Sequence, residues 1–489
     1  MQGLTIIAGT LILLTAAEQA LQSTSQDSQF TVDQLREDLA VLHSSLEEGH
    51  GGFYRYSSKA ELDLVFERAK EAIDGPMTEL EFYRLMAPVI AALNDGHTGL
   101  VGSRVIERQL QQESVLLPFK LGFVERIPYM HRNYSDHSEL VMGGELLSIN
   151  GKSMDEIVSE MIAAMPSDGR VVTSKYYRLE STTTFGDLYS RLFGITTSFD
   201  LTYKSPENGT VQSLTVDGLT AQELTRRFES RYPAVASSDR ERPPVDFAYR
   251  SGVPVLTVRT FGGRTIANAG IDYPAFLRNT FEELADTGAN DLIIDVRGNG
   301  GGSDVFGKLL AAYLIADTFD YYQHLEVNAD SFAFLKFTGM SNGDLPRDRL
   351  RANERGRFDF LGHPNLGPQQ PLEPHFAGNV YILINGGSFS ATGEFTSVVH
   401  HHKRATFIGE ECGAGYYGNT SGMMVMLELP NTGLRVRVPL VRYTMAVEGY
   451  EPTDRGLIPE HEVEPTVDDL LGDRDAVMEY ALEMIRRQM

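Results

Sequence analysis

The sequence has one cysteine, no tryptophan and a shortage of positive charge. It holds 43 Lys and Arg residues against 67 Asp and Glu residues, so 489 residues carry a net charge of −24. Nucleic-acid recognition starts from clustered Lys and Arg, so we do not expect nucleic acid as a partner. The lone Cys412 excludes an intrachain disulfide and a cysteine-based zinc site. We expect neither a metal ion nor a cofactor.

Long uncharged apolar runs are also scarce. The one stretch that stands out is "LTIIAGTLILLTAA", residues 4–17, which has no charge and ends in small residues. Its length is typical of a signal peptide rather than of a full membrane span. We predict that residues 1–20 are a signal peptide or an uncleaved anchor, and that the protein is extracytoplasmic, either periplasmic or secreted. Membrane association would then involve residues 4–17 only.

The rest of the chain is long enough for two to four domains. Residues 31–94 carry apolar side chains mostly at helical spacing, so 28–110 is predicted as a helical domain. Residues 115–220 mix short strands with helical stretches, and Asn208-Gly209 predicts a hairpin turn. We interpret this segment as a small mixed α/β module.

A charged linker with two prolines, "SSDRERPPVD", precedes the last predicted domain, residues 243–489. Here apolar runs of five to seven residues, such as "DLIIDV" and "NVYILI", alternate with helical stretches. Continuous rather than alternating apolar runs are typical of strands that are covered on both faces. The pattern predicts an α/β core.

Two glycine-rich turns follow strands of this core. The first, "RGNGGGSD", leads from a strand into a helix, an arrangement that directs free backbone N–H groups into a cleft. Such a turn can hold a phosphate or an oxyanion, or can be an ordinary tight turn. It lacks the Lys-Ser/Thr pair of a P-loop and the spacing G-x-G-x-x-G, so a phosphate fits poorly.

The second turn, "INGGSFSATGEF", carries two serines between a strand and a probable helix. A serine at such an elbow is presented above the sheet, and the N–H of the next residue points to where an oxyanion would form. This geometry favours Ser390 over Ser388 as a nucleophile. A helix N-cap is the alternative for either serine.

A nucleophilic serine needs a general base, and twelve histidines are available. His97, in the polar turn "LNDGHTGL", is a candidate, although it could instead cap the preceding helix. His400, His401 and His402 are consecutive, and helical geometry separates neighbouring side chains by about 100°. These three are therefore expected at a solvated helix end.

Four motifs in order give the chain a family resemblance. "LIIDVRGNGGG", "INGGSFSATGEF", "ATFIGEECGAGYYGN" and "DRGLIPEHEVEPTVDDLL" resemble the C-terminal processing (tail-specific) and tricorn-core serine peptidases. The resemblance implies an α/β fold with an N-terminal helical region, a PDZ-like mixed α/β module and a C-terminal crotonase-like ββα protease core. It also implies Ser390 as nucleophile, and the N–H groups of Gly302 and Ala391 as oxyanion donors.

The sequence departs from the processing proteases at one position. Their lysine base stands 25 residues after the serine, where this chain has Gly415. Lys403 is nearer, but it does not match the motif. The tricorn branch uses a histidine from the N-terminal part, which "DGHT" resembles, so His97 is the predicted general base. An acidic residue late in that branch organises the base, and Asp454 is the nearest match.

These residues together predict an exported serine endopeptidase that acts on peptides or proteins. Two alternatives stay open, namely a catalytically inactive peptide-binding scaffold and a hydrolase of non-peptide esters. The PDZ-like module could bind an extended peptide by strand addition. An unperturbed His97 would give a rate that rises with pH around roughly 6–7.

Overall fold

The computed structural model describes residues 29–488, so the predicted signal peptide or anchor lies outside the described residues. The chain begins with four helices, α2 (Val32–Gly49), α3 (Lys59–Ala72), α4 (Glu79–Ala91) and α5 (Arg104–Glu113). Capping boxes at Thr31, Ser58 and Thr78 begin the first three helices. In each box the hydroxyl of the cap residue accepts the backbone N–H of the residue three positions later, and the Glu or Gln side chain of that residue accepts the backbone N–H of the cap residue. The helical pattern expected for 31–94 is confirmed.

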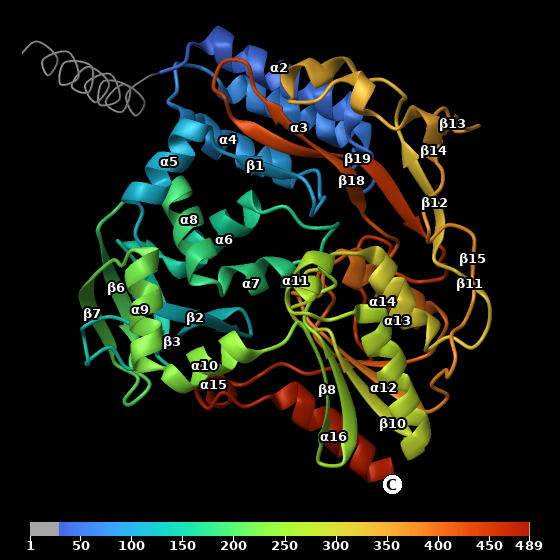
Figure 1. The fold of residues 1–489 in the computed structure, drawn as a ribbon. Helices are drawn as coiled ribbons and strands as arrows, with labels where there is room; N and C mark the ends of the chain where they lie inside the picture. The colour runs from blue at the N-terminus through green and yellow to red at the C-terminus, as the bar shows by residue number, and fades with distance from the viewer. Residues whose placement is uncertain (1–28, 489) are drawn as a thin grey trace, which may run out of the picture.

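An upper sheet packs under these helices (Figure 1). Its path runs β1 (Gly99–Val101), β19 (Arg435–Met445), β12 (Tyr322–Val327), β14 (Phe358–Phe360) and β13 (Leu350–Ala352), and β18 (Thr420–Glu428) pairs with β19. Short 3-10 helices lie beside it, η1 (Ala333–Phe337), η2 (Asn342–Asp344) and η3 (Arg347–Arg349). The sheet therefore joins residue 99 to segments more than 220 residues further on.

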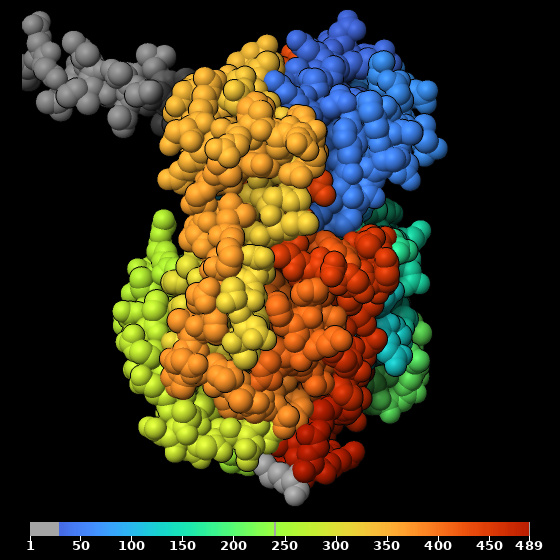
Figure 2. All heavy atoms as spheres, turned by 90° about the vertical axis from the view of Figure 1, so that its right-hand side faces the viewer, coloured from blue at the N-terminus to red at the C-terminus, as the bar shows by residue number. Residues whose placement is uncertain are grey.

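The helices and this sheet share one hydrophobic core. Leu39 and Phe82 of the helices belong to the same buried cluster as Leu427 and Val436 of the hairpin β18–β19 and Phe334 of η1. Figure 2 shows the same arrangement on the surface, where the segment around residues 330–370 lies against the N-terminal helices. The apolar face of the N-terminal helices is thus covered by C-terminal strands, so the predicted boundary at residue 110 does not separate two cores.

The middle module has a sheet in the order β2-β3-β4-β6-β7, with β5 beside β4. Figure 1 shows helices on its flank. Its β6–β7 hairpin turns at Asn208-Gly209 as predicted, with Gly209 in the left-handed region at φ 71°. The linker predicted around residue 240 is partly helical. The elements are β2 (Phe119–Val124), β3 (Ile127–Asn133), β4 (Glu145–Ile149), β5 (Lys152–Ser153), α6 (Met154–Ala164), α7 (Thr173–Leu179), α8 (Thr182–Phe193), β6 (Ser198–Lys204), β7 (Val211–Asp217), α9 (Ala221–Arg231) and α10 (Pro233–Glu241).

The C-terminal sheet has the order β20-β17-β16-β10-β9-β8, and all its strands except β8 run parallel. Core clusters cover both of its faces, one with α12 to α14 and one with α16, as the continuous apolar runs predicted. The elements are β8 (Val245–Arg250), β9 (Val253–Val258), α11 (Gly263–Asn268), α12 (Tyr273–Thr287), β10 (Asp291–Asp295), α13 (Asp304–Ala312), β11 (Phe319–Asp320), β15 (Pro368–Gln369), β16 (Asn379–Ile384), α14 (Ala391–His401), β17 (Thr406–Gly409), β20 (His461–Glu462), α15 (Val467–Leu471) and α16 (Ala476–Gln488).

Both glycine-rich turns leave this sheet at the carboxyl ends of adjacent strands, β10 and β16. Parallel strands place these ends along one edge, which is where α/β sheets commonly carry their sites. Among the described residues no helix combines the length and apolarity that a bilayer span requires.

Candidate active site

Ser390 stands at a strained elbow between β16 and α14. Its backbone has φ 58° and ψ −125°, so this non-glycine residue lies at positive φ immediately before the helix. A strained strand-to-helix turn of this kind holds a serine hydroxyl away from the helix and exposes it to a reacting group. Ser388 behaves differently, because its buried hydroxyl donates to Val296 O at 2.9 Å and accepts from Asn385 N at 3.2 Å. The structure separates the two serines into an elbow residue and a turn residue.

His97 reaches Ser390 from the other end of the chain. Its Nε2 lies 3.0 Å from Ser390 Oγ, and its ring stacks on Phe389 with 4.8 Å between centroids. The turn after α4 is fixed by Asp95 Oδ1, which accepts the N–H groups of His97 at 3.0 Å and Thr98 at 2.9 Å. The interpretation of His97 as a cap of that helix is wrong, since its imidazole points to Ser390.

Burial sets the protonation of this histidine. His97 is 8% exposed, and burial lowers its pKa below 6.5, with Asp168 and Asp95 acting in the opposite direction. Its Nδ1 is buried and has no hydrogen-bond partner among the described residues. The imidazole is therefore neutral at pH 7, the form in which Nε2 can accept a proton.

The glycine turn after β10 packs directly against the elbow. Phe389 N donates to Asn299 O at 3.0 Å, and Gly298 N and Gly387 N both donate to Asn385 Oδ1. A side chain at Gly301 would place its Cβ 2.8 Å from Ser390 Cβ, so only glycine permits this approach.

Among the described residues, the backbone N–H groups of Gly302 and Ala391 make no backbone hydrogen bond. The bridge between Phe261 and Gly302 uses Gly301 O and Ser303 N, at 3.0 and 2.8 Å, so the N–H of Gly302 takes no part in it. Gly302 adopts φ 137°, a conformation that L side chains rarely adopt. Ala391 begins α14, and the first N–H groups of a helix have no intrahelical acceptor. This arrangement can receive the oxygen of a tetrahedral intermediate.

The acidic residue next to the histidine is Asp168 rather than Asp454. Asp454 does not orient His97 in the structure, because both of its carboxylate oxygens contact Arg170, one of them at 2.9 Å. Asp168, 1% exposed, comes from the loop between α6 and α7 and accepts Gly96 N at 2.8 Å. The sequence "PSDGR" around Asp168 carries no motif, so sequence reasoning missed it.

The position of the processing-protease lysine is filled by other groups. Gly415 N donates to Asp168 Oδ2 at 3.0 Å, and a side chain at Gly415 would overlap the Tyr56 hydroxyl. Lys403 is exposed and lies beyond the far end of α14. The part of the chain that the structure describes therefore offers no lysine at this position, and no cluster of three metal-ligating side chains.

Tyr322, Asp304 and Glu394 form a second buried group that the sequence did not reveal. The Tyr322 hydroxyl lies 2.7 Å from both Asp304 Oδ2 and Glu394 Oε2, and its single hydrogen serves only one of them. The other contact needs a proton on a carboxyl group. Burial, with Asp304 as a like charge, raises the pKa of Glu394 to about 8, so Glu394 holds that proton at neutral pH.

A serine in contact with a histidine, at a strained turn after a strand of an α/β sheet, is a feature of the serine-type peptidases. Residues 253–467 match the sequence model of peptidase family S41. The protein is a serine-type peptidase, and this segment, which is less than half of the chain, resembles the S41 family. The resemblance to processing and tricorn-core peptidases is confirmed at this family level.

Solved structures share the fold over almost the whole chain. The complex of mature CPAF with lactacystin has a TM-score of 0.62 at 15% identity, covering 93% of this chain and 97% of that chain. A second structure of mature CPAF has a TM-score of 0.60 at 16% identity, covering 92% and 95%. No curated protein matches the sequence. The N-terminal helices, the middle module and the C-terminal sheet are thus common to both folds.

Proposed function

We propose that the protein is an exported serine endopeptidase in which Ser390 attacks the peptide carbonyl and His97 is the general base. The observation that carries the proposal is the 3.0 Å contact between His97 Nε2 and Ser390 Oγ at the strained elbow. His97 takes the hydroxyl proton during attack and returns it to the leaving amine. The N–H groups of Gly302 and Ala391 stabilise the oxyanion, each contributing about 3–4 kcal/mol in comparable sites.

Asp168 assists the histidine through its charge. Burial raises the pKa of Asp168, and the neighbouring His97 lowers it. When His97 becomes an imidazolium ion, the ionised Asp168 stabilises that charge, and Asp168 is the largest influence that opposes burial on the pKa of His97. Asp168 also holds the N–H of Gly96, so it fixes the backbone that carries the ring. The middle module thereby contributes a residue to the catalytic centre.

The middle module resembles a PDZ domain, but strand addition is restricted at its β2 edge. β2 is the end strand of the sheet, and Glu180 Oε1 accepts Phe123 N at 3.2 Å. The residue that follows α7 thus occupies one of the donors that an added peptide strand would use. We infer that a peptide reaches Ser390 without pairing at this position.

Labelling by a fluorophosphonate probe tests the proposal directly. We expect the wild-type protein and Ser388→Ala to be labelled and Ser390→Ala to remain unlabelled, with all three folded by circular dichroism. Incubation with a peptide library, followed by mass spectrometry, then shows whether internal peptide bonds are cleaved. A folded protein that takes up no probe would be a scaffold, and cleavage of an ester panel alone would identify an esterase. N-terminal sequencing of protein from its native compartment tests removal of residues 1–20.

A further inference from the structure

A cavity opens along the carboxyl edge of the C-terminal sheet, away from the Ser390 contact. It measures about 810 Å³, and neither Ser390 nor His97 lines it. One wall consists of β2 and α7 of the middle module, and the other consists of residues 463–477. Asn385, Glu410 and Glu464 line its floor, and they follow the carboxyl ends of β16, β17 and β20. The cavity therefore has the location that ligands favour in parallel sheets.

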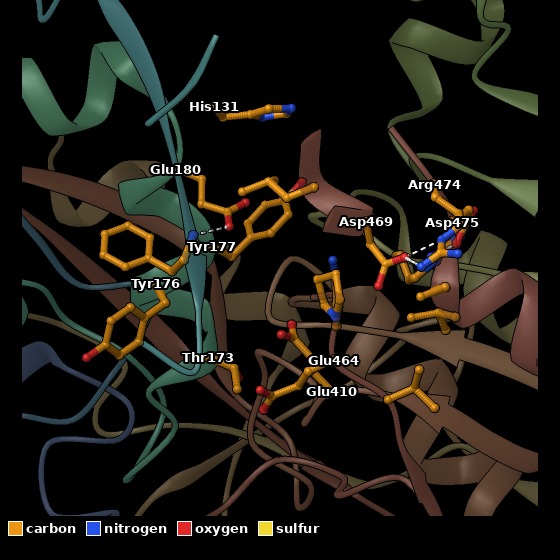
Figure 3. Close-up of a pocket in the computed structure, with 18 of the residues that line it drawn as sticks. His131, Thr173, Tyr176, Tyr177, Glu180, Glu410, Glu464, Asp469, Arg474 and Asp475 are labelled. Atoms are coloured by element: carbon orange, nitrogen blue, oxygen red, sulfur yellow. Dashed lines mark hydrogen bonds and ion pairs between the residues drawn. The ribbon is translucent and has the colours of Figure 1, made fainter. Parts of the chain in front are cut away.

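The floor and the α7 wall carry carboxylates that form no close ion pair with a described side chain. None of the ion pairs among the described side chains involves Glu180, Glu410 or Glu464, although Lys120 and Arg297 lower the pKa of Glu180 and Glu410 respectively. Figure 3 shows Glu410 and Glu464 side by side below Glu180 and Tyr177. Burial raises the pKa of Glu410 to about 7, and Glu180 and Glu464 add to this as like charges. A bound cation would relieve this repulsion.

Most positive side chains that line the cavity form ion pairs with aspartates or contact an aromatic ring. Arg297 binds Asp295 and Asp475, with distances of 2.7 to 2.9 Å, and Arg474 pairs with Asp469. Arg126 lies over the Tyr176 ring, and Lys120 stands on the β2 wall near Glu180 and His131. Among the described residues Lys120 and Arg126 form no ion pair, and both lie on the β2 side. Arg242 also lines the cavity and has an interaction partner.

A buried ring nitrogen on the β2 side also lacks a hydrogen-bond partner among the described residues. The His131 side chain is 8% exposed and lines the cavity, and burial lowers its pKa to about 4, so the ring is neutral. Its Nε2 lies 3.6 Å from Asp473 Oδ1, and the Leu470 backbone and Asp473 both act to raise its pKa. Nδ1 makes no hydrogen bond of normal geometry among the described residues. Buried polar atoms normally find a partner, so this atom indicates that a ligand brings one.

We propose that this cavity is a binding site for the cationic side chain of a peptide, a lysine ammonium or an arginine guanidinium group. Glu410 and Glu464 accept its N–H groups, and the Tyr177 ring, 39% exposed in the same cavity, offers an aromatic surface to the cation. The His131 ring, at the opposite end of the cavity in Figure 3, forms a hydrogen bond with the same peptide. Peptides that contain Lys or Arg would therefore bind at this cavity.

The experiment measures binding in Ser390→Ala, so the outcome does not depend on catalysis. The probe is a fluorescent decapeptide with one central lysine and blocked termini, and its partner carries Nε-acetyl-lysine at that position. We expect the lysine peptide to bind on the order of tenfold more tightly, because acetylation removes the charge. Adding Glu410→Gln should abolish this preference, and Glu464→Gln, which changes an exposed side chain, should reduce it.

The matched control is Glu373→Gln, because Glu373 is exposed and does not line the cavity. It should leave the preference for the lysine peptide intact. Equal binding of the lysine and acetyl-lysine peptides would overturn the proposal. A preference for the lysine peptide that persists in Glu410→Gln, with native circular dichroism, would also overturn it, because the cation would then bind elsewhere. Spermidine is the third probe. If spermidine binds and the lysine peptide does not, the assignment to peptides is wrong.

Discussion

Two buried carboxyl groups, on Asp95 and Glu394, lie near the start of α14 and hold opposite protonation states. Asp95 accepts the N–H groups of His97 and Thr98, the Thr98 hydroxyl at 3.0 Å, and the Thr420 hydroxyl. Burial raises its pKa, but His50, His97 and the hydroxyl donors outweigh burial and lower it overall. Glu394 receives one amide donor, from Asn419 at 2.8 Å, and shares the Tyr322 hydroxyl with Asp304.

The difference shows that the donors around a carboxyl group, rather than its depth, decide its charge. Both side chains are 3% exposed or less. Four hydrogen-bond donors keep Asp95 ionised, whereas a like charge and fewer donors keep Glu394 protonated. Asp95 fixes the turn that carries His97, the proposed base, and Glu394 lies in the helix that follows Ser390. Substitutions near Asp95 should therefore change activity, whereas substitution of Glu394 should change stability.

The largest effect is expected from removing the proposed base near Asp95. His97→Ala should reduce kcat by on the order of 10²–10⁴-fold and leave KM nearly unchanged, because the imidazole acts on a proton and not on substrate binding. Steady-state kinetics on a peptide substrate measure it. A folded variant with a near-native rate would make another group, such as Lys403, the base.

Asp168→Asn should cost less, on the order of 10-fold to 100-fold in kcat, because the imidazolium loses a neighbouring negative charge. In the wild type, burial of His97 places the rising limb of the pH–rate profile below pH 6.5, lower than the sequence alone predicts. Asp168 raises the pKa of His97, so its removal should shift that limb to still lower pH. Asp454→Asn is the matched control, and it should change neither the rate nor the profile.

Glu394→Gln tests the protonated state of Glu394 through stability. The pKa of Glu394 rises from 4.5 in the unfolded chain to about 8 in the folded protein. Its stabilising contribution is present below pH 4.5 and is lost as the pH rises through 8, on the order of a few kcal/mol. Glutamine mimics the protonated acid, so the variant should lose this decline. Thermal unfolding between pH 5 and 9 shows the slope, and an unchanged slope would mean that Glu394 is ionised.

Ser388→Ala should have the smallest effect on activity. Its hydroxyl makes two hydrogen bonds inside the turn, so the change should cost about 1–2 kcal/mol of stability and leave a measurable rate. Urea unfolding and kinetics on one preparation measure both quantities. Loss of turnover equal to that of Ser390→Ala, with folding intact, would undo the separation of the two serines.

The sequence predicted the residues that stand in motifs and missed those that tertiary folding delivers. Ser390 was predicted because a strand, a glycine turn and a helix follow one another locally, and His97 was predicted because "DGHT" resembles a family pattern. Asp168 has no such signal, since its loop becomes part of the site only when the middle module docks against Gly96 and Gly415. Asp454 was predicted to orient His97 because of its position late in the chain. In the structure its carboxylate pairs with Arg170.

The fold shows the same difference between features that local sequence predicts and features that depend on long-range contacts. Local patterns predicted the N-terminal helices, the β6–β7 hairpin and the buried parallel strands, because capping residues, an Asn-Gly turn and apolar runs are local signals. The pairing of β1 with β19 could not be predicted, because it joins Gly99 to Arg437 across most of the chain. The same strand anchors the histidine turn, where Arg437 Nε donates to His97 O at 2.6 Å.

That pairing sets an order of events during synthesis. The ribosome produces His97 early, but β1 has no partner until the last strand of the upper sheet has emerged, and the Ser390 elbow also comes late. If His97 and Ser390 act as proposed, a nascent chain would hold the histidine before the serine, and both before the strand β19 that pairs with β1. The proposed hydrolytic activity would then appear only after β19 has been synthesised.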